Sequence, residues 1–447
     1  MPMKTPICDF VSEYSKSGTL RMHMPGHKGK NLLGIEHLDI TEIKGADSLY
    51  EADGIIAESE KNASALFGCK TFYSAEGSSL GIRAMLYLTS LYSKEANRDK
   101  IIWAGRNAHK TFINTVALLD LDIEWLSSEN DSYLSYTVCA DKLEEKLKMA
   151  ERLPTAIYLT SPDYLGNTAD IKALSAVCKK YGVLLLVDNA HGAYLHFLEE
   201  SKHPIELGAD MCCDSAHKTL PVLTGGAYLH ISPNAPPVFE ANAKKALSLF
   251  GSTSPSYLIL QSLDKANQYL SDSYKTRLCS TAKEIESLKS KLIKKGYNLV
   301  GNEELKITFE TKKYGYTGNE FAEILRLNSI ECEFCDPDYT VLMLTPENGK
   351  EEITRIKEVL LSIEKKTVIS SLPLEIHLPK KAVSIREATL SPNETIDAKN
   401  SLGRVLAFSN AACPPAVPIV VSGEIIDENA IKCFEYYGIE KCCVVKS

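Results

Sequence analysis

Short apolar runs alternate with amphipathic stretches from residue 58 to residue 295. Leu184 to Val187 is apolar at every position, which is typical of a strand covered on both faces, and we expect the strand to begin at Val183. The preceding segment, Ile171 to Tyr181, spaces its apolar residues as one face of a helix does. Strands separated by helices of this length predict right-handed crossovers and a mostly parallel sheet.

The rest of this region follows the same two patterns. We expect further helices at Ala57–Phe67, Ile82–Tyr92, Thr111–Leu119 and Asp141–Arg152. We expect further strands at Ile101–Ala104, Ile123–Leu126, Ala156–Thr160 and Asp210–Cys213. Gly68 is suited to end the first helix, and Tyr257–Lys295 predicts two long helices broken near Ser271.

The pattern changes at both ends of this region. Residues 1–45 predict a loop-rich arm, because the segment 24–30 is dense in turn-forming residues. Residues 46–296 form the expected large α/β domain, and 297–447 a smaller α+β domain. In the smaller domain we expect strands at Leu305–Phe309 and Val341–Leu344, helices at Glu320–Leu327 and Lys350–Lys365, and a connector at Thr367–Lys381.

Composition narrows the class of protein. The 447 residues are 44% hydrophobic and 24% charged, as in a globular protein with a sizeable core, which excludes fibrous and disordered chains. A net charge of −8 gives no electrostatic footprint for nucleic acid. We find no apolar run long enough to span a membrane and no signal-peptide pattern, and we expect a cytoplasmic protein.

Thirteen scattered cysteines suit a reducing compartment. Cys332 and Cys335 form a C-x-x-C motif, but no second pair lies at zinc spacing, so we interpret them as strand residues and expect no metal site.

Four clusters follow predicted strands or begin predicted helices, where ligand sites of α/β sheets lie. Gly77, Ser78 and Ser79 precede a helix, whose first N–H groups attract phosphate, although serine there is often only an N-cap. Asp188 ends the most apolar strand, where a carboxylate needs a cation or hydrogen-bond donors. A salt bridge or an N-cap role would meet that need as well as a ligand would. His109 follows another strand and either begins a helix or faces a planar ligand.

Lys218, in Ser215–Ala216–His217–Lys218, supplies an amine suited to a Schiff base, whereas most single lysines are surface charges. Together the clusters match the needs of pyridoxal phosphate: an anchored phosphate, an amine for its aldehyde and an anion opposite its ring nitrogen.

The sequence resembles the ornithine/lysine/arginine decarboxylase family of fold-type-I pyridoxal-phosphate enzymes, in its short form without the N-terminal regulatory domain. The motifs that carry the resemblance are MPGHKG (24–29), GSS-x-G (77–81), RNAHK (106–110), SP-x-Y-x-G (161–166), VD-x-AHG (187–192), SAHKTLP (215–221), STSPSY (252–257), SIREA (384–388) and PPAVP (414–418).

The resemblance implies a fold-type-I transferase fold whose large domain binds pyridoxal 5'-phosphate. Lys218 would carry the cofactor, Asp188 would pair with its ring nitrogen and His109 would stack on its ring, with His217 as a further catalytic candidate. The family's other cofactor contacts map onto Gly77, Ser78, Ser79, His191, Ser215 and His217, and onto Ser252 or Thr253 of a partner subunit, which implies a homodimer with shared active sites.

The implied reaction is decarboxylation of a basic amino acid to an amine and CO₂ in polyamine biosynthesis, with arginine first and lysine or ornithine next. Glu51, Asp53, Glu333 and Glu424 are candidates for the substrate's cationic end. Transamination, aldol cleavage or elimination would use the same lysine and aspartate; transamination needs a carboxylate clamp, for which Arg386 is the candidate. An inactive regulatory relative is a further alternative. Glu76, where the family usually has Asn, departs from the phosphate motif.

Overall fold

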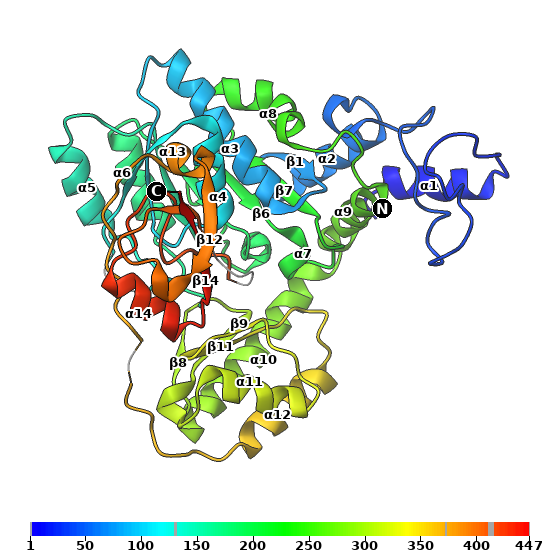
Figure 1. The fold of residues 1–447 in the computed structure, drawn as a ribbon. Coiled ribbons are helices and arrows are strands. Elements are labelled where there is room, and N and C mark those ends of the chain that lie inside the picture. The colour runs from blue at the N-terminus through cyan, green and yellow to red at the C-terminus, as the bar shows by residue number, and fades with distance from the viewer. Residues whose placement is uncertain (1, 129–131, 372, 410–414, 447) are drawn as a thin grey trace. The chain divides into compact units, whose positions relative to one another are not determined.

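The computed structural model describes residues 2–128, 132–371, 373–409 and 415–446. The chain divides into two compact units, each built from two segments. Figure 1 labels most of the helices and strands named below. The first unit comprises Met1–Asp99 and Cys178–Leu278, and the second comprises Lys100–Val177 and Cys279–Ser447. The predicted boundaries at residues 45 and 296 divide the chain differently and stay a prediction.

The first unit contains the strands in the order β1-β7-β6-β5. The pairs β1–β7 and β7–β6 are antiparallel, whereas β6 and β5 are parallel. Every position of β5, β6 and β7 is buried, so side chains cover both faces of these strands. The strands are β1 (Lys70–Ser74), β5 (Leu184–Asp188), β6 (Met211–Asp214) and β7 (Ala227–Ile231). The helices are α1 (Pro6–Lys16), α2 (Ile55–Phe67), α3 (Gly77–Glu95), α7 (Ala216–Thr219), α8 (Pro237–Phe250) and α9 (Tyr257–Ser271), with 3₁₀ turns at Leu49–Glu51 and Ala193–Phe197.

The second unit contains three parallel strands and two antiparallel sheets. The parallel strands lie in the order β4-β2-β3, with β2 (Ile101–Ala104) between β4 (Ala156–Thr160) and β3 (Asp122–Trp125). The helices that follow these strands are α4 (Lys110–Leu119), α5 (Ala140–Met149) and α6 (Ile171–Lys180), the last of which runs past the unit boundary.

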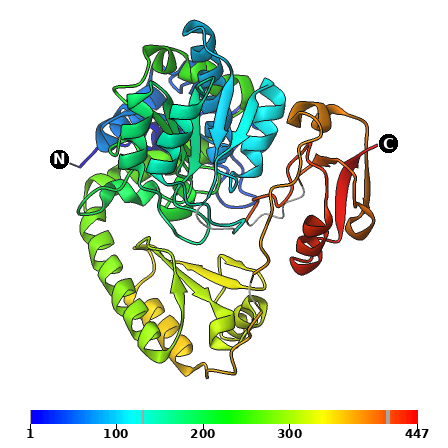
Figure 2. The same cartoon turned by 90° about the vertical axis from the view of Figure 1, so that its left-hand side faces the viewer.

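The antiparallel sheets of this unit use the C-terminal part of the chain, coloured yellow to red in Figure 2. One has the order β10-β11-β9-β8 and the other β12-β14-β13. Their strands are β8 (Leu299–Val300), β9 (Lys306–Glu310), β10 (Phe334–Cys335), β11 (Tyr339–Met343), β12 (Asn393–Asp397), β13 (Leu406–Phe408) and β14 (Lys441–Val445). The helices are α11 (Gly318–Leu327), α12 (Lys350–Ser362), α13 (Ile385–Leu390) and α14 (Glu428–Tyr436), with 3₁₀ turns at Thr311–Tyr314 and Ala398–Asn400; α10 (Tyr274–Lys295) crosses the unit boundary.

The predicted α/β class with mostly parallel strands is confirmed. The strands expected at Ile101–Ala104 and Ala156–Thr160 have these same bounds, and the break near Ser271 separates α9 from α10. Gly68 ends α2 with a φ of 63°, a left-handed conformation that glycine adopts without strain.

The arm that was expected to be loop-rich also contains the helix α1 at Pro6–Lys16. Pro6 begins this helix, and Ile7 and Val11 are fully buried, so burial of one apolar face stabilises it despite the turn-rich segment that follows. Likewise, α3 begins at Gly77 rather than at Ile82, which places the two serines inside its first turn. Among the described residues, no helix combines the length and the apolar character needed to cross a membrane.

Candidate active site

Lys218 lies on the short helix α7, directly after β6. Its Nζ lies 3.0 Å from Nε2 of His191, which follows the neighbouring parallel strand β5. An ammonium group can only donate, so this ring nitrogen accepts the hydrogen bond. Lys218 is half-buried and His191 is 5% exposed. The carboxyl ends of β5 and β6 therefore bring an amine and an imidazole into contact.

Asp188 is the last residue of β5 and is 2% exposed. Its Oδ1 accepts a hydrogen bond from the backbone N–H of Ala190 at 3.2 Å, and the Cys213 thiol lies 3.9 Å away. A carboxylate buried to this extent costs free energy unless a cation or a set of donors meets it. Its position at the carboxyl end of β5, the strand that His191 follows, suits pairing with a cationic ring nitrogen.

The N-terminus of α3 supplies an anion cradle in the same unit. The Ser215 hydroxyl donates to the Ser78 hydroxyl at 2.8 Å, which joins the loop after β6 to the first turn of α3. Gly77 has a φ of 71°, and a Cβ built on it meets nothing within 4 Å, so the space beside this turn is open. Ser79 follows in the same turn, half-buried. Open space, convergent hydroxyls and helix N–H groups fit a phosphate.

The orientation of His217 is set by Gly226. Both the backbone N–H and the Nδ1 of His217 lie within hydrogen-bond distance of the Gly226 carbonyl oxygen, at 3.2 and 3.0 Å. Because a carbonyl accepts, Nδ1 must carry the proton, and Nε2 is the ring nitrogen left for proton exchange in the neutral ring.

Ser252 and Thr253 are exposed in the segment that precedes α9. The carboxylate of Glu76 accepts a hydrogen bond from the backbone N–H of Ser252 at 2.5 Å. The unusual glutamate therefore binds the backbone of the loop that precedes α9.

A buried ionic network behind these loops was not predicted from the sequence. Asp214, fully buried at the end of β6, lies 3.1 Å from Nε2 of His203 and 3.3 Å from Nε2 of His230. Its other oxygen accepts a hydrogen bond from the amide of Asn189 at 2.7 Å. Asn189 directly follows Asp188, so the network joins the loops after β5 and β6.

Electrostatics keep Asp214 ionised. Burial alone raises its pKa, but the charges and hydrogen bonds of His203 and His230 hold the pKa well below the ordinary value. Burial lowers the pKa of His230, which Asp214 partly offsets. Within the described residues, these three side chains are the group whose ligand atoms converge closely enough for a metal ion. Their spacing equally suits proton-mediated hydrogen bonds, so the expectation of no metal stays a prediction.

His109 belongs to the second unit, where it caps the N-terminus of α4. Its Nδ1 accepts a hydrogen bond from the backbone N–H of Thr111 at 3.1 Å, which leaves the proton of the neutral ring on Nε2. The side chain is half-buried. Its role in stacking stays a prediction.

Two other candidates, Glu424 and Arg386, bind other protein groups within the second unit. The carboxylate of Glu424 forms a buried ion pair with Arg106 at 2.9 Å and accepts a hydrogen bond from the Val421 N–H, which excludes it as an available partner for a substrate cation. Arg386 donates to the carbonyl oxygens of Ala117 and Leu118 at the end of α4, at 2.9 and 3.0 Å. The first residue of the PPAVP motif, Pro414, lies outside the described residues.

Comparison with known proteins adds independent information. The model of the family "Orn/Lys/Arg decarboxylase, major domain" matches residues 5–302. The chain is 28% identical to an arginine decarboxylase of Bacillus subtilis (strain 168), over 96% of this chain and 92% of that protein. It is 27% identical to an arginine decarboxylase of Halalkalibacterium halodurans, over 95% and 92%. The constitutive lysine decarboxylase of E. coli has a similar fold, with a TM-score of 0.78 and 16% identity, over 99% of this chain and 82% of that chain.

Proposed function

The chain belongs to the Orn/Lys/Arg decarboxylase family, and on that premise we propose that it removes the α-carboxylate of a basic amino acid with the help of pyridoxal 5'-phosphate. The family match over residues 5–302 carries this proposal, because that range contains the whole cluster around Lys218. The fold agrees, since the fold-type-I arrangement is shared with lysine decarboxylases.

The residues present fit the cofactor that the family implies. Lys218 would hold its aldehyde, and Asp188 would face its ring nitrogen. Ser78, Ser79 and Ser215 would bind the phosphate beside the open space at Gly77, with His191 and His217 near the ring. When bound, pyridoxal phosphate supplies an electron sink for the pair that the departing CO₂ leaves on the α-carbon.

The protein's own groups then have distinct tasks. Asp188 would favour the protonated form of the cofactor's ring nitrogen, because a buried anion is stabilised by a cation. Lys218 and His217 are the candidates to protonate the α-carbon after CO₂ leaves. His191 accepts a hydrogen bond from the Lys218 amine and so fixes where that amine lies. The buried walls of β5 and β6 exclude water from one side of the site.

Among the basic amino acids, we propose arginine as the substrate. The relatives named arginine decarboxylase align with nearly the whole chain at 26–28% identity, whereas the lysine decarboxylase structure supports the fold alone. Glu51 and Asp53 are exposed and stay candidates for the substrate's cationic end. Glu333 already accepts a hydrogen bond from the Tyr164 hydroxyl at 2.8 Å. Because Arg386 binds backbone carbonyls, we find no observation that favours transamination.

We further propose a cytoplasmic homodimer that serves polyamine biosynthesis. Exposed Ser252 and Thr253 would reach the partner's phosphate site. The arm supports association, because five of its large apolar side chains are 68–87% exposed: Leu20, Met22, Met24, Leu32 and Leu33. Apolar side chains gathered in this way favour burial against another surface, here a second copy of the chain.

The decisive experiment offers the cofactor-loaded protein equimolar arginine, lysine and ornithine and identifies the products by mass spectrometry. We expect agmatine and CO₂. Cadaverine or putrescine would reassign the substrate within the family, and a keto acid would overturn decarboxylation in favour of transamination. The Lys218→Ala protein, treated identically, is the control for conversion that does not use this site.

A second experiment tests the shared site. Chains carrying Lys218→Ala are mixed, after dissociation, with chains carrying both Ser252→Ala and Thr253→Ala. Random pairing makes half of the dimers mixed, each with one intact site, so activity should recover to about a quarter of the wild-type value. No recovery, with mixed dimers demonstrated by mass, would refute the contribution from the partner.

A further inference from the structure

Cys332 and Cys335 lie in the second unit, far along the chain from Lys218. Cys332 lies in the loop after α11, and Cys335 ends β10, the edge strand of its sheet. Both side chains are half-buried. The interpretation of both as strand residues was therefore wrong for Cys332, because β10 begins only at Phe334. This C-x-x-C motif therefore places two partly accessible thiols at the edge of a sheet.

Contacts around the pair distinguish the two sulfurs. Nη2 of Arg326 lies 3.9 Å from the Cys335 sulfur. The interaction with the Cys332 thiol has the largest effect, and with Arg326 it lowers the pKa of Cys335 to about 6, although burial and the Glu331 carboxylate act in the opposite direction. The same interaction raises the pKa of Cys332. These shifts favour the thiolate form at Cys335 and the thiol form at Cys332.

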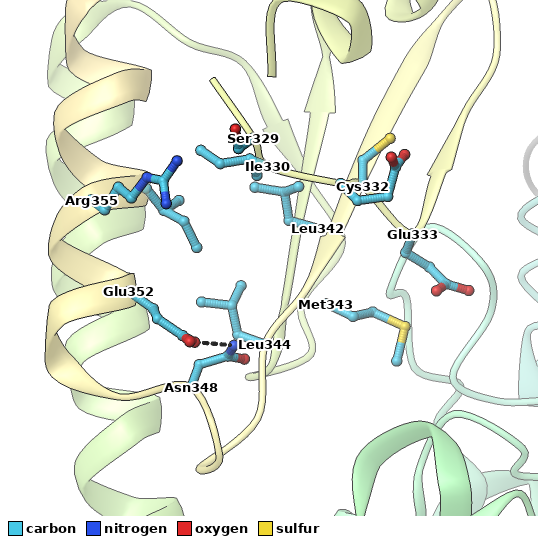
Figure 3. Close-up of a pocket in the computed structure, with 12 residues that line it drawn as sticks. Ser329, Ile330, Cys332, Glu333, Leu342, Met343, Leu344, Asn348, Glu352 and Arg355 are labelled. Carbon is cyan, nitrogen blue, oxygen red and sulfur yellow. Dashed lines mark hydrogen bonds between the residues drawn. The ribbon is translucent and has the colours of Figure 1, made fainter. Parts of the chain in front are cut away.

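Cys332 lines a pocket of about 460 Å³, and Cys335 is itself half-buried rather than fully buried. Figure 3 shows Cys332 and Glu333 on one side of this pocket and Arg355 on α12 on the other. The Arg355 guanidinium is held by the carbonyl oxygen of Asn328 at 2.7 Å. A small molecule can therefore approach Cys332 without unfolding of the sheet.

Three other cysteines that the structure describes lack this combination. Cys212 and Cys213 are fully buried, and burial raises the pKa of both thiols well above the ordinary value. Burial, with Asp264 nearby, raises the pKa of Cys8 to about 12. Thiolate character and access together decide which cysteine reacts.

We propose that Cys332 and Cys335 form a thiol–disulfide exchange site for low-molecular-weight disulfides. The Cys335 thiolate attacks one sulfur of the disulfide, the S–S bond breaks, and one thiolate leaves and takes up a proton. The Cys332 thiol then loses its proton to solvent and attacks the Cys335 sulfur, which releases the second thiol. Two protein thiols become one disulfide while the small disulfide is reduced to two thiols. An excess of small thiol reverses both steps.

Oxidised glutathione is the probe, applied to the folded, cofactor-loaded protein and followed by peptide mass spectrometry. We expect a disulfide between Cys332 and Cys335, reversed by reduced glutathione. Cys332→Ser should trap the mixed disulfide on Cys335, whereas Cys335→Ser should not accumulate one on Cys332 at a comparable rate. Cys279→Ser is the matched control, because it removes another half-buried thiol and should leave the reaction unchanged.

The initial rate gives a quantitative test at pH 6. There about half of Cys335 is thiolate, against about 0.3% for an ordinary thiol with a pKa of about 8.5; lower nucleophilicity cancels part of this gain, leaving about a tenfold advantage. The reference is the same cysteine in urea-unfolded protein. Arg326→Gln, a change of a partly exposed side chain, should slow the folded protein. A folded rate no faster than the unfolded rate, or equal trapping in both serine variants, would overturn the proposal.

Discussion

Replacement of Asp214 by Asn should destabilise the protein strongly and in a pH-dependent manner. The substitution keeps the shape of the side chain but removes its charge. In the native structure one oxygen accepts from Asn189 at 2.7 Å and the other lies 3.1 and 3.3 Å from the ring nitrogens of His203 and His230. An asparagine offers one oxygen and one NH₂ group, so it cannot accept from all three neighbours. At least one buried donor therefore loses its acceptor.

The size of the effect follows from burial. Asp214 and both histidines are fully buried, so water cannot replace the lost partner. Removal of one member of a buried ionic network costs about 3–5 kcal/mol of unfolding free energy. For a unit of this size that corresponds to a fall in melting temperature of about 6–20 °C. Asp272→Asn changes an exposed aspartate of the same unit and should alter stability by less than about 0.5 kcal/mol.

The pH dependence has a definite sign. Because the folded-state pKa of Asp214 is depressed, its contribution is complete above about pH 4 and is lost only as the pH falls below that value. Burial depresses the pKa of His230, so unfolded chains take up a proton there below about pH 6.5. Without the Asp214 charge this pKa falls further. The stability difference between variant and wild type should then widen once the pH falls below the folded-state pKa of His230 in the wild type, by up to about 1.4 kcal/mol per pH unit.

Differential scanning calorimetry of both variants and the wild type at several pH values measures these quantities. If Asp214→Asn melts within 2 °C of Asp272→Asn, which is about 1 kcal/mol or less, the network contributes little and the reasoning from burial fails. A difference that narrows between pH 8 and pH 5 would refute the assigned electrostatics even if the destabilisation at pH 8 is large.

Three further substitutions test the active site. Lys218→Ala removes the amine proposed to hold the cofactor, so mass spectrometry should detect no agmatine from arginine; wild-type turnover would contradict that role. Asp188→Asn removes a buried charge, and CO₂ release should slow by about 10²–10³-fold with cofactor retained; a loss below tenfold would exclude the aspartate as a support for the reaction. Glu76→Ala removes the acceptor of the Ser252 N–H and should weaken cofactor binding about fivefold, whereas Glu76→Gln should restore it; equal dissociation constants for all three proteins would separate Glu76 from the cofactor site.

Hydrophobic patterning predicted the strands that are buried on both faces. Leu184 to Val187 is apolar throughout and forms most of β5, all of whose positions are buried. The pattern did not predict elements whose formation depends on tertiary contacts. β1 and β7 pair with each other although residues 70 and 231 are far apart in sequence, and β1 carries an exposed lysine at its start. Helix α1 lies in a turn-rich arm, and its buried face could not be inferred without knowing what covers it.

For the candidate site, the motifs predicted which residues come together in one unit but not the contacts among them. Lys218 and His191 are 27 residues apart, and only the adjacent parallel strands β5 and β6 explain why their side chains meet. The sequence showed Glu76 only as a departure from the motif, and the structure shows that its carboxylate accepts a hydrogen bond from the Ser252 N–H. Arg386, a candidate clamp by type and motif, bonds instead to the end of α4, which no sequence pattern indicates.

The residues that sequence reasoning missed share a physical reason. His203, Asp214 and His230 come from a loop and two strand positions, and each taken alone has an ordinary explanation as a polar residue near a strand. Their importance arises because the fold buries all three together, where a carboxylate is stable only beside a proton donor or a cation. Cys332 and Cys335 differ from this case, because their spacing was visible in the sequence while their reactivity depends on Arg326 and on access from the pocket. Spacing identifies such a pair, but burial and charge decide its chemistry.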